Sequence, residues 1–287
     1  MYRIGIIGSE NSHAAAFAEI FGAGKDGKYS DIEVVAIGGI DHEASLKVQE
    51  ICPTAQVIDR AEDMVDLVDA AMITSRDGAL HLAQAKPFLE AGKPLFVDKP
   101  FTRNTEEAIT LIQMAQEKGI PLVGGSSVKY ADAVLRLTRQ AANGEVLGGD
   151  VTAPVNMVNE YGGFFFYASH LVEVMMHIFG YDIQEVLALR SGKGVTAVAR
   201  YADFDVTNHF QEGCYVYSAT LYQKGKTQFE ELDIQDIYQK ECENFAHMLR
   251  TGHMDETYEQ LIRPVFYMEA LEKSYTTGTV QKIERRI

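Results

Sequence analysis

The sequence predicts an α/β protein with two domains. Residues 1–125 are expected to form a Rossmann-type, doubly wound parallel sheet, and residues 126–287 an α+β domain with an open, mainly antiparallel sheet. Short apolar runs alternate with helical patterns up to about residue 125, which is typical of parallel β/α units. Beyond that point the apolar runs lengthen, and several alternate apolar with polar residues, as half-buried antiparallel strands do. A chain of 287 residues also suits two cores better than one.

In the first domain, each predicted strand is a short apolar run that precedes or follows a helical pattern. The strands are expected at residues 3–8, 33–38, 56–58, 70–74, 95–97 and 122–124. The helices between them are expected to begin near Ser12, His42, Ala61, Gly78 and Thr105. Right-handed crossovers then place helices on both faces of the sheet. Ligands of such folds bind beyond the carboxyl ends of the strands, so the loops there are the expected site.

The second domain is predicted to combine longer strands with four helices. The strands are expected at residues 149–159, 185–189, 195–200, 206–210, 215–222 and 227–232. The helices are expected at residues 129–142, 166–179, 237–249 and 255–275, with Pro264 kinking the last. The open sheet of this domain is a plausible surface for a homo-oligomer, although the sequence does not fix its stoichiometry.

Charge and cysteine content exclude several functional classes. The net charge of -15 argues against nucleic acid, because phosphate binding needs clustered cations. No apolar run approaches the roughly 20 residues of a membrane span. The three cysteines are isolated, which fits a reducing cytoplasm, and neither C-x-x-C nor H-E-x-x-H occurs, so no metal site is expected.

The loop after the first strand reads G-S-E-N-S-H, Gly8 to His13, and leads into a helix. A strand, a tight turn and a helix N-terminus receive the pyrophosphate of a dinucleotide, usually through G-x-G-x-x-G. Gly8 is retained, whereas Glu10 and His13 replace the second and third glycines. Glu10 brings bulk and negative charge to the place of the pyrophosphate. The loop also offers polar candidates for cofactor binding: Ser9, Asn11, Ser12 and His13. Asn11 or Ser12 is alternatively the N-cap of the helix.

The end of the second strand also departs from the usual pattern. Dinucleotide folds place an acidic residue there for the adenosine ribose, but Gly39 occupies that position. Asp41, two residues later, is a candidate ribose ligand or else a helix N-cap. No arginine nearby favours a 2′-phosphate, so the choice between NAD and NADP stays open.

Three stretches together resemble the Gfo/Idh/MocA family, which includes glucose–fructose oxidoreductase and inositol dehydrogenase types. The first is the opening strand, turn and helix. The second is residues 69–102, which contain T-S-R-D-G-A-L-H, E-A-G-K and D-K-P and look like the family's E-K-P segment. The third is G-G-F-F-F-Y-A-S-H-L-V-E, residues 162–173, similar to the family's G-G-x-x-x-D-x-G-x-H-x-x-D helix.

The resemblance implies NAD- or NADP-dependent oxidation of a hydroxyl of a sugar, cyclitol or related small molecule, or the reverse reduction. It places Lys99 at cofactor and substrate, and His170 where a histidine takes the hydroxyl proton. A lysine there can stabilise charge on a substrate oxygen. The expected cofactor contacts near the strand ends are Thr74, Ser75, His81, Asp98, Lys99 and Pro100. For His81, packing against the next strand is an equally good interpretation.

One departure concerns the helix that carries His170. The family's assisting aspartate lies four residues before this histidine, and Phe166 stands there. Glu173 and Tyr167 share a helical face with His170 and are candidates to replace the aspartate. The altered loop and this replacement leave two alternatives open: a ligand-binding or sensor protein without turnover, or a lyase or hydrolase on the same fold.

Overall fold

The computed structural model describes residues 1–23 and 27–284, and the chain divides into two compact units. Unit 1 comprises residues 1–125 together with Tyr238–Leu261, and unit 2 comprises Ser126–Ile237 and the chain from Ile262 onward. The first segment of unit 1 ends with strand β6 (Leu122–Gly125).

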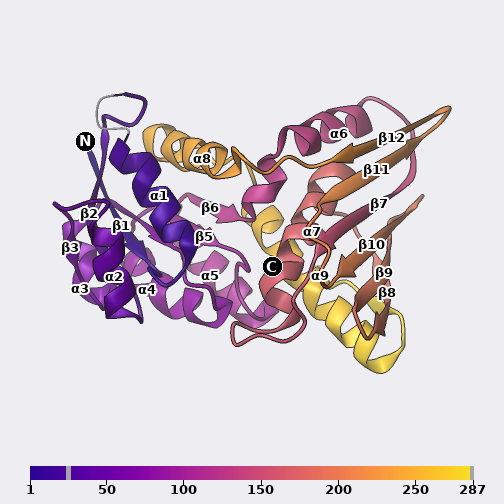
Figure 1. Ribbon diagram of the computed structural model, residues 1–287, viewed down its shortest axis with the longest axis horizontal. Coiled ribbons are helices and arrows are strands. Elements are labelled where there is room, and N and C mark those ends of the chain that lie inside the picture. Colours follow the sequence, from indigo (N-terminus) through magenta and orange to yellow (C-terminus); the bar gives the residue numbers. More distant parts are fainter. Residues whose placement is uncertain (24–26, 285–287) are drawn as a thin grey trace. The chain divides into compact units, whose positions relative to one another are not determined.

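The sheet of unit 1 is parallel throughout, with the order β3-β2-β1-β4-β5-β6 (Figure 1). Besides β6, its strands are β1 (Tyr2–Ile7), β2 (Ile32–Gly38), β3 (Gln56–Val57), β4 (Ala70–Ile73) and β5 (Leu95–Asp98). The order reverses direction between β1 and β4, which places the switch point of the doubly wound sheet at the end of β1. The predicted fold class of this part is confirmed.

Side chains cap some of the helices of unit 1 and not others. They are α1 (Ser12–Ala23), α2 (His42–Gln49), α3 (Ala61–Met64), α4 (His81–Glu90) and α5 (Thr105–Lys118), with short 3-10 turns at Val65–Leu67 and Gly78–Leu80. Asp41 caps α2 by accepting the Ala44 N–H at 3.0 Å, and Asn104 caps α5 through the Glu107 N–H at 2.8 Å. The helix expected from Gly78 is thus a 3-10 turn that leads into α4.

Helix α8 (Ile237–Thr251) packs with unit 1, rather than with residues 126–287 with which the sequence grouped it (Figure 1). Its Cys242, Phe245, Ala246 and Met248 belong to the same apolar cluster as α1. The Phe245 ring lies 6.1 Å from the Phe21 ring. An amphipathic helix packs on whichever apolar face it reaches, and sequence periodicity does not specify that face.

The sheet of unit 2 has the order β12-β11-β7-β10-β9-β8-β13, and only the β7–β10 pair is parallel. Its strands are β7 (Val146–Pro154), β8 (Glu185–Ser191), β9 (Gly194–Arg200), β10 (Asp205–Gln211), β11 (Ser218–Gln223), β12 (Lys226–Glu231) and β13 (Gln281–Lys282). The predicted mainly antiparallel sheet is confirmed. Strand β11 begins later than expected, and Tyr215 lies in the preceding loop with 88% of its surface exposed.

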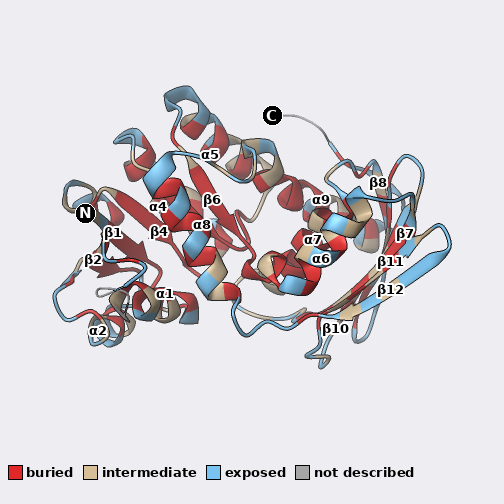
Figure 2. Ribbon diagram, turned by 90° about the horizontal axis from the view of Figure 1, so that it is seen from above, coloured by how far each residue is buried: buried red, intermediate tan, exposed pale blue. Residues whose placement is uncertain are grey.

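Helices cover one face of this sheet, and α7 (Phe164–Phe179) lies in the core of the unit (Figure 2). The others are α6 (Asp132–Ala142) and α9 (Tyr258–Thr277), with a 3-10 turn at Ser127–Tyr130 before α6. Almost every residue of α7 is buried, including the polar Ser169, His170 and Glu173. Burying a polar group is costly unless it is hydrogen-bonded. The partners of His170 and Glu173 are therefore described with the candidate site below.

Candidate functional site

The turn after β1 is a tight structure that only glycine permits at its first position. Gly8 has a φ of 114°, and a Cβ atom there would lie 2.1 Å from the backbone nitrogen of Ser75. The N–H groups of Gly8 and Ser9 both donate to the Gly38 carbonyl, at 2.8 and 3.2 Å. The Ser9 hydroxyl donates to the same oxygen at 2.8 Å. Ser9 therefore ties the turn to β2.

Two polar residues of this loop turn inward to the ends of β4 and β5. The Asn11 side-chain amide donates to the Thr74 carbonyl at 2.8 Å and to Asp98 Oδ2 at 3.1 Å. Asn11 Oδ1 accepts the His13 N–H at 3.3 Å, so Asn11 also caps α1, as one interpretation of the sequence proposed. His13 Nδ1 lies 2.7 Å from Asp98 Oδ2. The histidine in the third glycine position thus forms an ion pair with the strand end beneath it.

Asp98 is a fully buried carboxylate that several donors hold in its charged form. Besides the His13 ring and the Asn11 amide, the Lys99 N–H donates to its Oδ1 at 2.7 Å. Burial raises the pKa of Asp98, but the charges of His13 and Lys99 and these hydrogen bonds lower it by more, so that the pKa lies below its ordinary value. The aspartate of D-K-P therefore joins the altered loop to β5.

Lys99 follows Asp98 directly at the end of β5, and only 3% of its surface is exposed. The Lys99–Pro100 peptide bond is cis. Pro100 packs against Gly78, where a Cβ atom would lie 2.8 Å from its ring. The lysine of D-K-P is thus a buried cation at the carboxyl edge of the sheet, where the family resemblance expects it.

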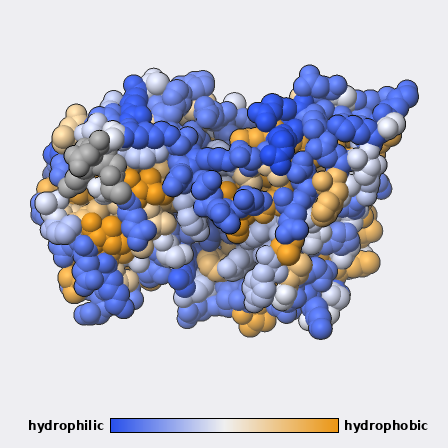
Figure 3. Space-filling view, turned by 45° about the horizontal axis from the view of Figure 1, so that its top comes forward, coloured by the Kyte–Doolittle hydropathy of each residue, from blue (hydrophilic) through white to orange (hydrophobic). Residues whose placement is uncertain are grey.

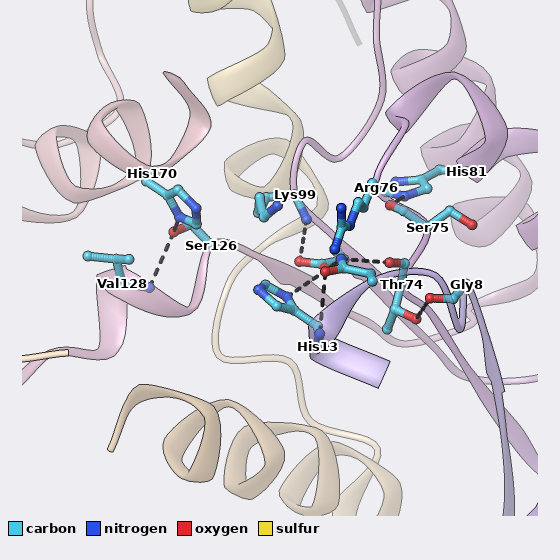
Figure 4. A network of polar contacts seen from close by, with 12 residues as sticks. Gly8, His13, Thr74, Ser75, Arg76, His81, Lys99, Ser126, Val128 and His170 are labelled. Atoms are coloured by element: carbon cyan, nitrogen blue, oxygen red, sulfur yellow. Dashed lines mark hydrogen bonds and ion pairs between the residues drawn. The ribbon is translucent and has the colours of Figure 1, made fainter. Parts of the chain in front are cut away.

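The end of β4 is fixed by hydrogen bonds that occupy Thr74 and His81. The Thr74 hydroxyl lies 3.0 Å from the Ile7 carbonyl oxygen and 3.2 Å from that of Gly8. His81 is fully buried, with Nε2 2.8 Å from the Ser75 carbonyl oxygen and Nδ1 3.2 Å from that of Phe101 (Figure 4). Of the two interpretations of His81, the geometry supports packing, because both ring nitrogens face the backbone. Ser75 Oγ is also buried, and among the described residues it has no hydrogen-bond partner.

Four polar residues near the strand ends of unit 1 are less buried than Asp98. Ser12, the first residue of α1, is exposed and remains a candidate for anion binding. Glu10 is partly buried, and its Oε1 accepts the backbone N–H of Arg76 at 3.3 Å. Arg76 was missed by sequence reasoning, since only its position after β4 draws attention to it. Asp41 caps α2 and is exposed, which supports the cap interpretation of that residue.

In unit 2, His170 has a partner that the sequence did not reveal. The Ser126 hydroxyl oxygen lies 2.6 Å from His170 Nδ1, and it also accepts the Val128 N–H at 3.2 Å (Figure 4). A hydroxyl both donates and accepts hydrogen bonds, so it can pair with either tautomer of the imidazole. The Ser126 hydroxyl thus contacts the Nδ1 side of the imidazole.

Glu173 is coupled to this pair through the backbone of Ser126. Its Oε2 accepts the Ser126 N–H at 2.7 Å and lies 3.2 Å from Lys129 Nζ. Glu173 and Lys129 are 6% and 1% exposed, so the ion pair is buried. A buried, hydrogen-bonded pair of this kind fixes local geometry. Glu173 therefore fixes the position of Ser126.

Tyrosine rings flank His170 in the same unit. The rings of Tyr167 and Tyr217 lie 5.7 and 6.0 Å from the imidazole. Tyr167 also lines a cavity of about 290 Å³ with Asn156, Glu212 and Tyr215. Phe166, in the place of the expected aspartate, contacts the Tyr161 and Tyr167 rings. Within residues 1–23 and 27–284, no three His, Cys, Asp or Glu side chains are placed to hold a metal ion.

Comparison with known proteins gives one family match and several relatives. Residues 2–125 match the family model described as "Oxidoreductase family, NAD-binding Rossmann fold". The UDP-N-acetylglucosamine 3-dehydrogenase of Acidithiobacillus ferrooxidans is 30% identical over 198 residues, which cover 64% of this chain and 59% of that protein. The inositol 2-dehydrogenase of Gluconacetobacter diazotrophicus is 32% identical over 122 residues, 41% of this chain and 35% of that protein. The chain thus matches less than two thirds of the length of either relative.

Solved structures agree with the fold along almost the whole chain. GenD2 from gentamicin A biosynthesis, solved in complex with NAD, has a TM-score of 0.86 at 16% identity and covers 99% of this chain and 97% of its own. Scyllo-inositol dehydrogenase from Lactobacillus casei, solved with NAD(H) and scyllo-inositol, has a TM-score of 0.83 at 14% identity, with 99% of both chains covered. At such low identity the likeness to these structures concerns the fold alone.

Proposed function

We propose that this chain is an NAD(P)-dependent oxidoreductase of the Gfo/Idh/MocA family, and the match of residues 2–125 to the family model supports this proposal. Its substrate would be a hydroxyl, or in reverse a carbonyl, of a sugar, cyclitol or related small molecule. The relatives support this class, since they act on inositols and on a nucleotide sugar. The nicotinamide cofactor supplies hydride acceptance or donation when it is bound.

The observation that carries the proposal is the hydrogen bond between the Ser126 hydroxyl and His170 Nδ1. With Nδ1 engaged at 2.6 Å, proton transfer with a substrate hydroxyl would run through Nε2. In unit 1, the family resemblance assigns to Lys99 the stabilisation of negative charge on a substrate oxygen. Tyr167, beside the imidazole, would orient the substrate. Ser126 and Glu173 would keep the imidazole in place throughout.

The residues of unit 1 fit a dinucleotide at the carboxyl ends of the strands. The exposed Ser12 and the N-terminus of α1 would meet the pyrophosphate. Other polar residues of the loop and the strand ends bond to one another or to the backbone, and would hold the loop in the shape that receives the cofactor. They are Ser9, Asn11, His13, Thr74 and Asp98.

Fluorescence titration of NADH and NADPH, followed by turnover assays, tests the proposal. The substrate panel would contain myo-inositol, scyllo-inositol and UDP-N-acetylglucosamine, with NAD reduction followed by absorbance. Saturable binding and turnover of a polyol or nucleotide sugar are expected, and His170→Asn should abolish turnover while leaving NADH affinity intact. Absence of dinucleotide binding up to millimolar concentration would instead support a non-redox role.

We also propose that the chain forms a homo-oligomer through the outer face of the unit 2 sheet. Apolar side chains on that face are exposed, among them Leu189 at 65% and Phe229 at 64%. In the view of Figure 3, hydrophilic residues predominate and apolar residues gather only in small groups.

In the described part of the chain, all three cysteines are free thiols, which supports a reducing cytoplasm. Among the helices of the same residues, none has the length and apolarity to cross a membrane.

A further inference from the structure

The end of β2 lacks the side chain that normally binds the adenosine ribose in a dinucleotide fold. An acidic residue usually stands there. Gly39 holds the position, and its φ of 151° lies in a region that L side chains rarely adopt. Asp41, the nearest acid along the chain, accepts the Ala44 N–H as the cap of α2. The ribose position therefore has no carboxylate from β2 itself.

The carboxylate of Glu10 occupies the space that a side chain at position 39 would need. A Cβ atom on Gly39 would lie 3.2 Å from Glu10 Oε2 and 3.1 Å from the backbone nitrogens of Gly8 and Ser9. Glu10 comes from the turn after β1, yet its side chain reaches the end of β2. Glutamate at position 10 and glycine at position 39 are thus sterically matched.

One oxygen of this carboxylate is engaged and the other is not. Oε1 accepts the Arg76 N–H at 3.3 Å, which holds the group between the ends of β2 and β4. Oε2 is shielded from solvent, and within the described residues no donor reaches it. A carboxylate oxygen without a donor is costly, and hydroxyl groups are suitable donors. Rotation about the last side-chain bond of Glu10 exchanges its two oxygens, so either can accept the Arg76 N–H while the other is left to accept from a ligand; the residue itself is only partly buried.

We propose that Glu10 accepts the hydrogen bonds of the adenosine ribose hydroxyls in place of an acid at the end of β2, and thereby makes this chain selective for NAD over NADP. A 2′-phosphate would remove one hydroxyl donor and bring negative charge against the carboxylate. This inference rests on the proposed dinucleotide binding and adds its specificity. The residue that looked like an obstacle to the cofactor becomes one of its ligands.

The test is fluorescence titration of NADH and of NADPH into the wild-type protein, Glu10→Gln and the control Glu19→Gln. Glu19 is exposed on α1, directly after the same loop. The wild type should bind NADH at least about tenfold more tightly than NADPH, since hydrogen bonds to a charged group are worth about that factor or more. Glu10→Gln should weaken NADH binding about tenfold, strengthen NADPH binding because the repulsion of the 2′-phosphate is removed, and leave the thermal midpoint unchanged. Glu19→Gln should match the wild type.

Two outcomes would overturn the inference while leaving the proposed function intact. Tighter binding of NADH by Glu10→Gln would show that the carboxylate obstructs the cofactor. If the wild type and Glu10→Gln both bind NADH and have the same ratio of NADH affinity to NADPH affinity, Glu10 does not determine cofactor specificity. Failure of all three proteins to bind either dinucleotide would overturn the proposed cofactor itself.

Discussion

Asp98 shows how the unusual loop and the D-K-P segment depend on each other. Its carboxylate is charged and fully buried, and the loop supplies two of its partners, Asn11 and His13. A glycine in place of His13 would leave this carboxylate without its ion pair. The histidine in the third glycine position is therefore part of the same network as the D-K-P segment.

Asp98→Asn should destabilise the protein, in a way that depends on pH. Loss of one partner of a buried ion pair costs about 3–5 kcal/mol, so the free energy of unfolding should fall by about that amount at pH 7. The folded-state pKa of Asp98 lies below its unfolded value, so its stabilisation is present above the ordinary carboxyl pKa of about 4 and is lost as pH falls through the folded-state pKa. Urea unfolding at neutral and acidic pH measures the difference, which should shrink on acidification. The exposed Asp63→Asn is the control, and equal stability of Asp98→Asn at all pH values would contradict the network.

Ser126 is the residue on which the behaviour of His170 should depend most. Ser126→Ala removes the hydroxyl beside Nδ1 and should lower kcat about tenfold or more, since a general base works only when it is correctly oriented. NADH affinity should stay constant and the pH profile of kcat should shift, with Ser126→Thr restoring both. Ser169→Ala is a matched control, because Ser169 is also buried in unit 2 and its hydroxyl has no hydrogen-bond partner in the described chain. An unaltered pH profile for Ser126→Ala would rule out the positioning role.

At the scale of secondary-structure elements, helix α8 is the one whose place in the fold matters most. It follows strand β12 of unit 2 in sequence but completes the core of unit 1 beside α1. The Phe245 ring contacts both Phe21 of α1 and Phe96 of β5. The helix also forms an ion pair through Arg250 with Asp31. Unit 1 therefore depends on a segment more than 100 residues downstream of its sheet.

Phe245→Ala should lower the free energy of unfolding by about 3–5 kcal/mol, the usual effect of removing a buried phenylalanine. Chemical unfolding measures the loss, and NADH binding should weaken in parallel where unit 1 is partly unfolded. Gln239→Ala, at an exposed position of the same helix, should change stability by less than about 0.5 kcal/mol. Equal stability of the two variants would show that α8 is not part of this core.

At the scale of the whole molecule, the proposed homo-oligomer involves the outer face of the unit 2 sheet. Leu189 and Leu187 of β8 point away from the buried Val186 and Ala188. Exposed apolar residues on one sheet face are typical of interaction surfaces when they recur along neighbouring strands. The proposed homo-oligomer would form through this face.

Leu189→Arg should shift the protein toward a monomer, because a charge buried in the proposed contact between copies is left unpaired. Light scattering after size-exclusion chromatography measures the mass of the particle. Val158→Arg, at a loop residue that is 82% exposed, should leave the mass unchanged. A wild-type protein that is monomeric at all concentrations would refute the proposed assembly.

The sequence determined the parts of the molecule that follow from local pattern. Apolar runs and helical periods gave the parallel sheet of unit 1, the mainly antiparallel sheet of unit 2 and the loops in which Gly8, Lys99 and His170 lie. These features depend on residues that are neighbours along the chain, so periodicity and turn chemistry contain the information.

Only the tertiary structure decided which of these residues meet. Ser126 lies 44 positions from His170, and Asn11 lies 87 positions from Asp98. The carboxylate of Glu10 reaches the end of a strand that it does not follow. A single sequence has no local signal for such pairs, because their contact results from the packing of strand ends and helices that are distant along the chain.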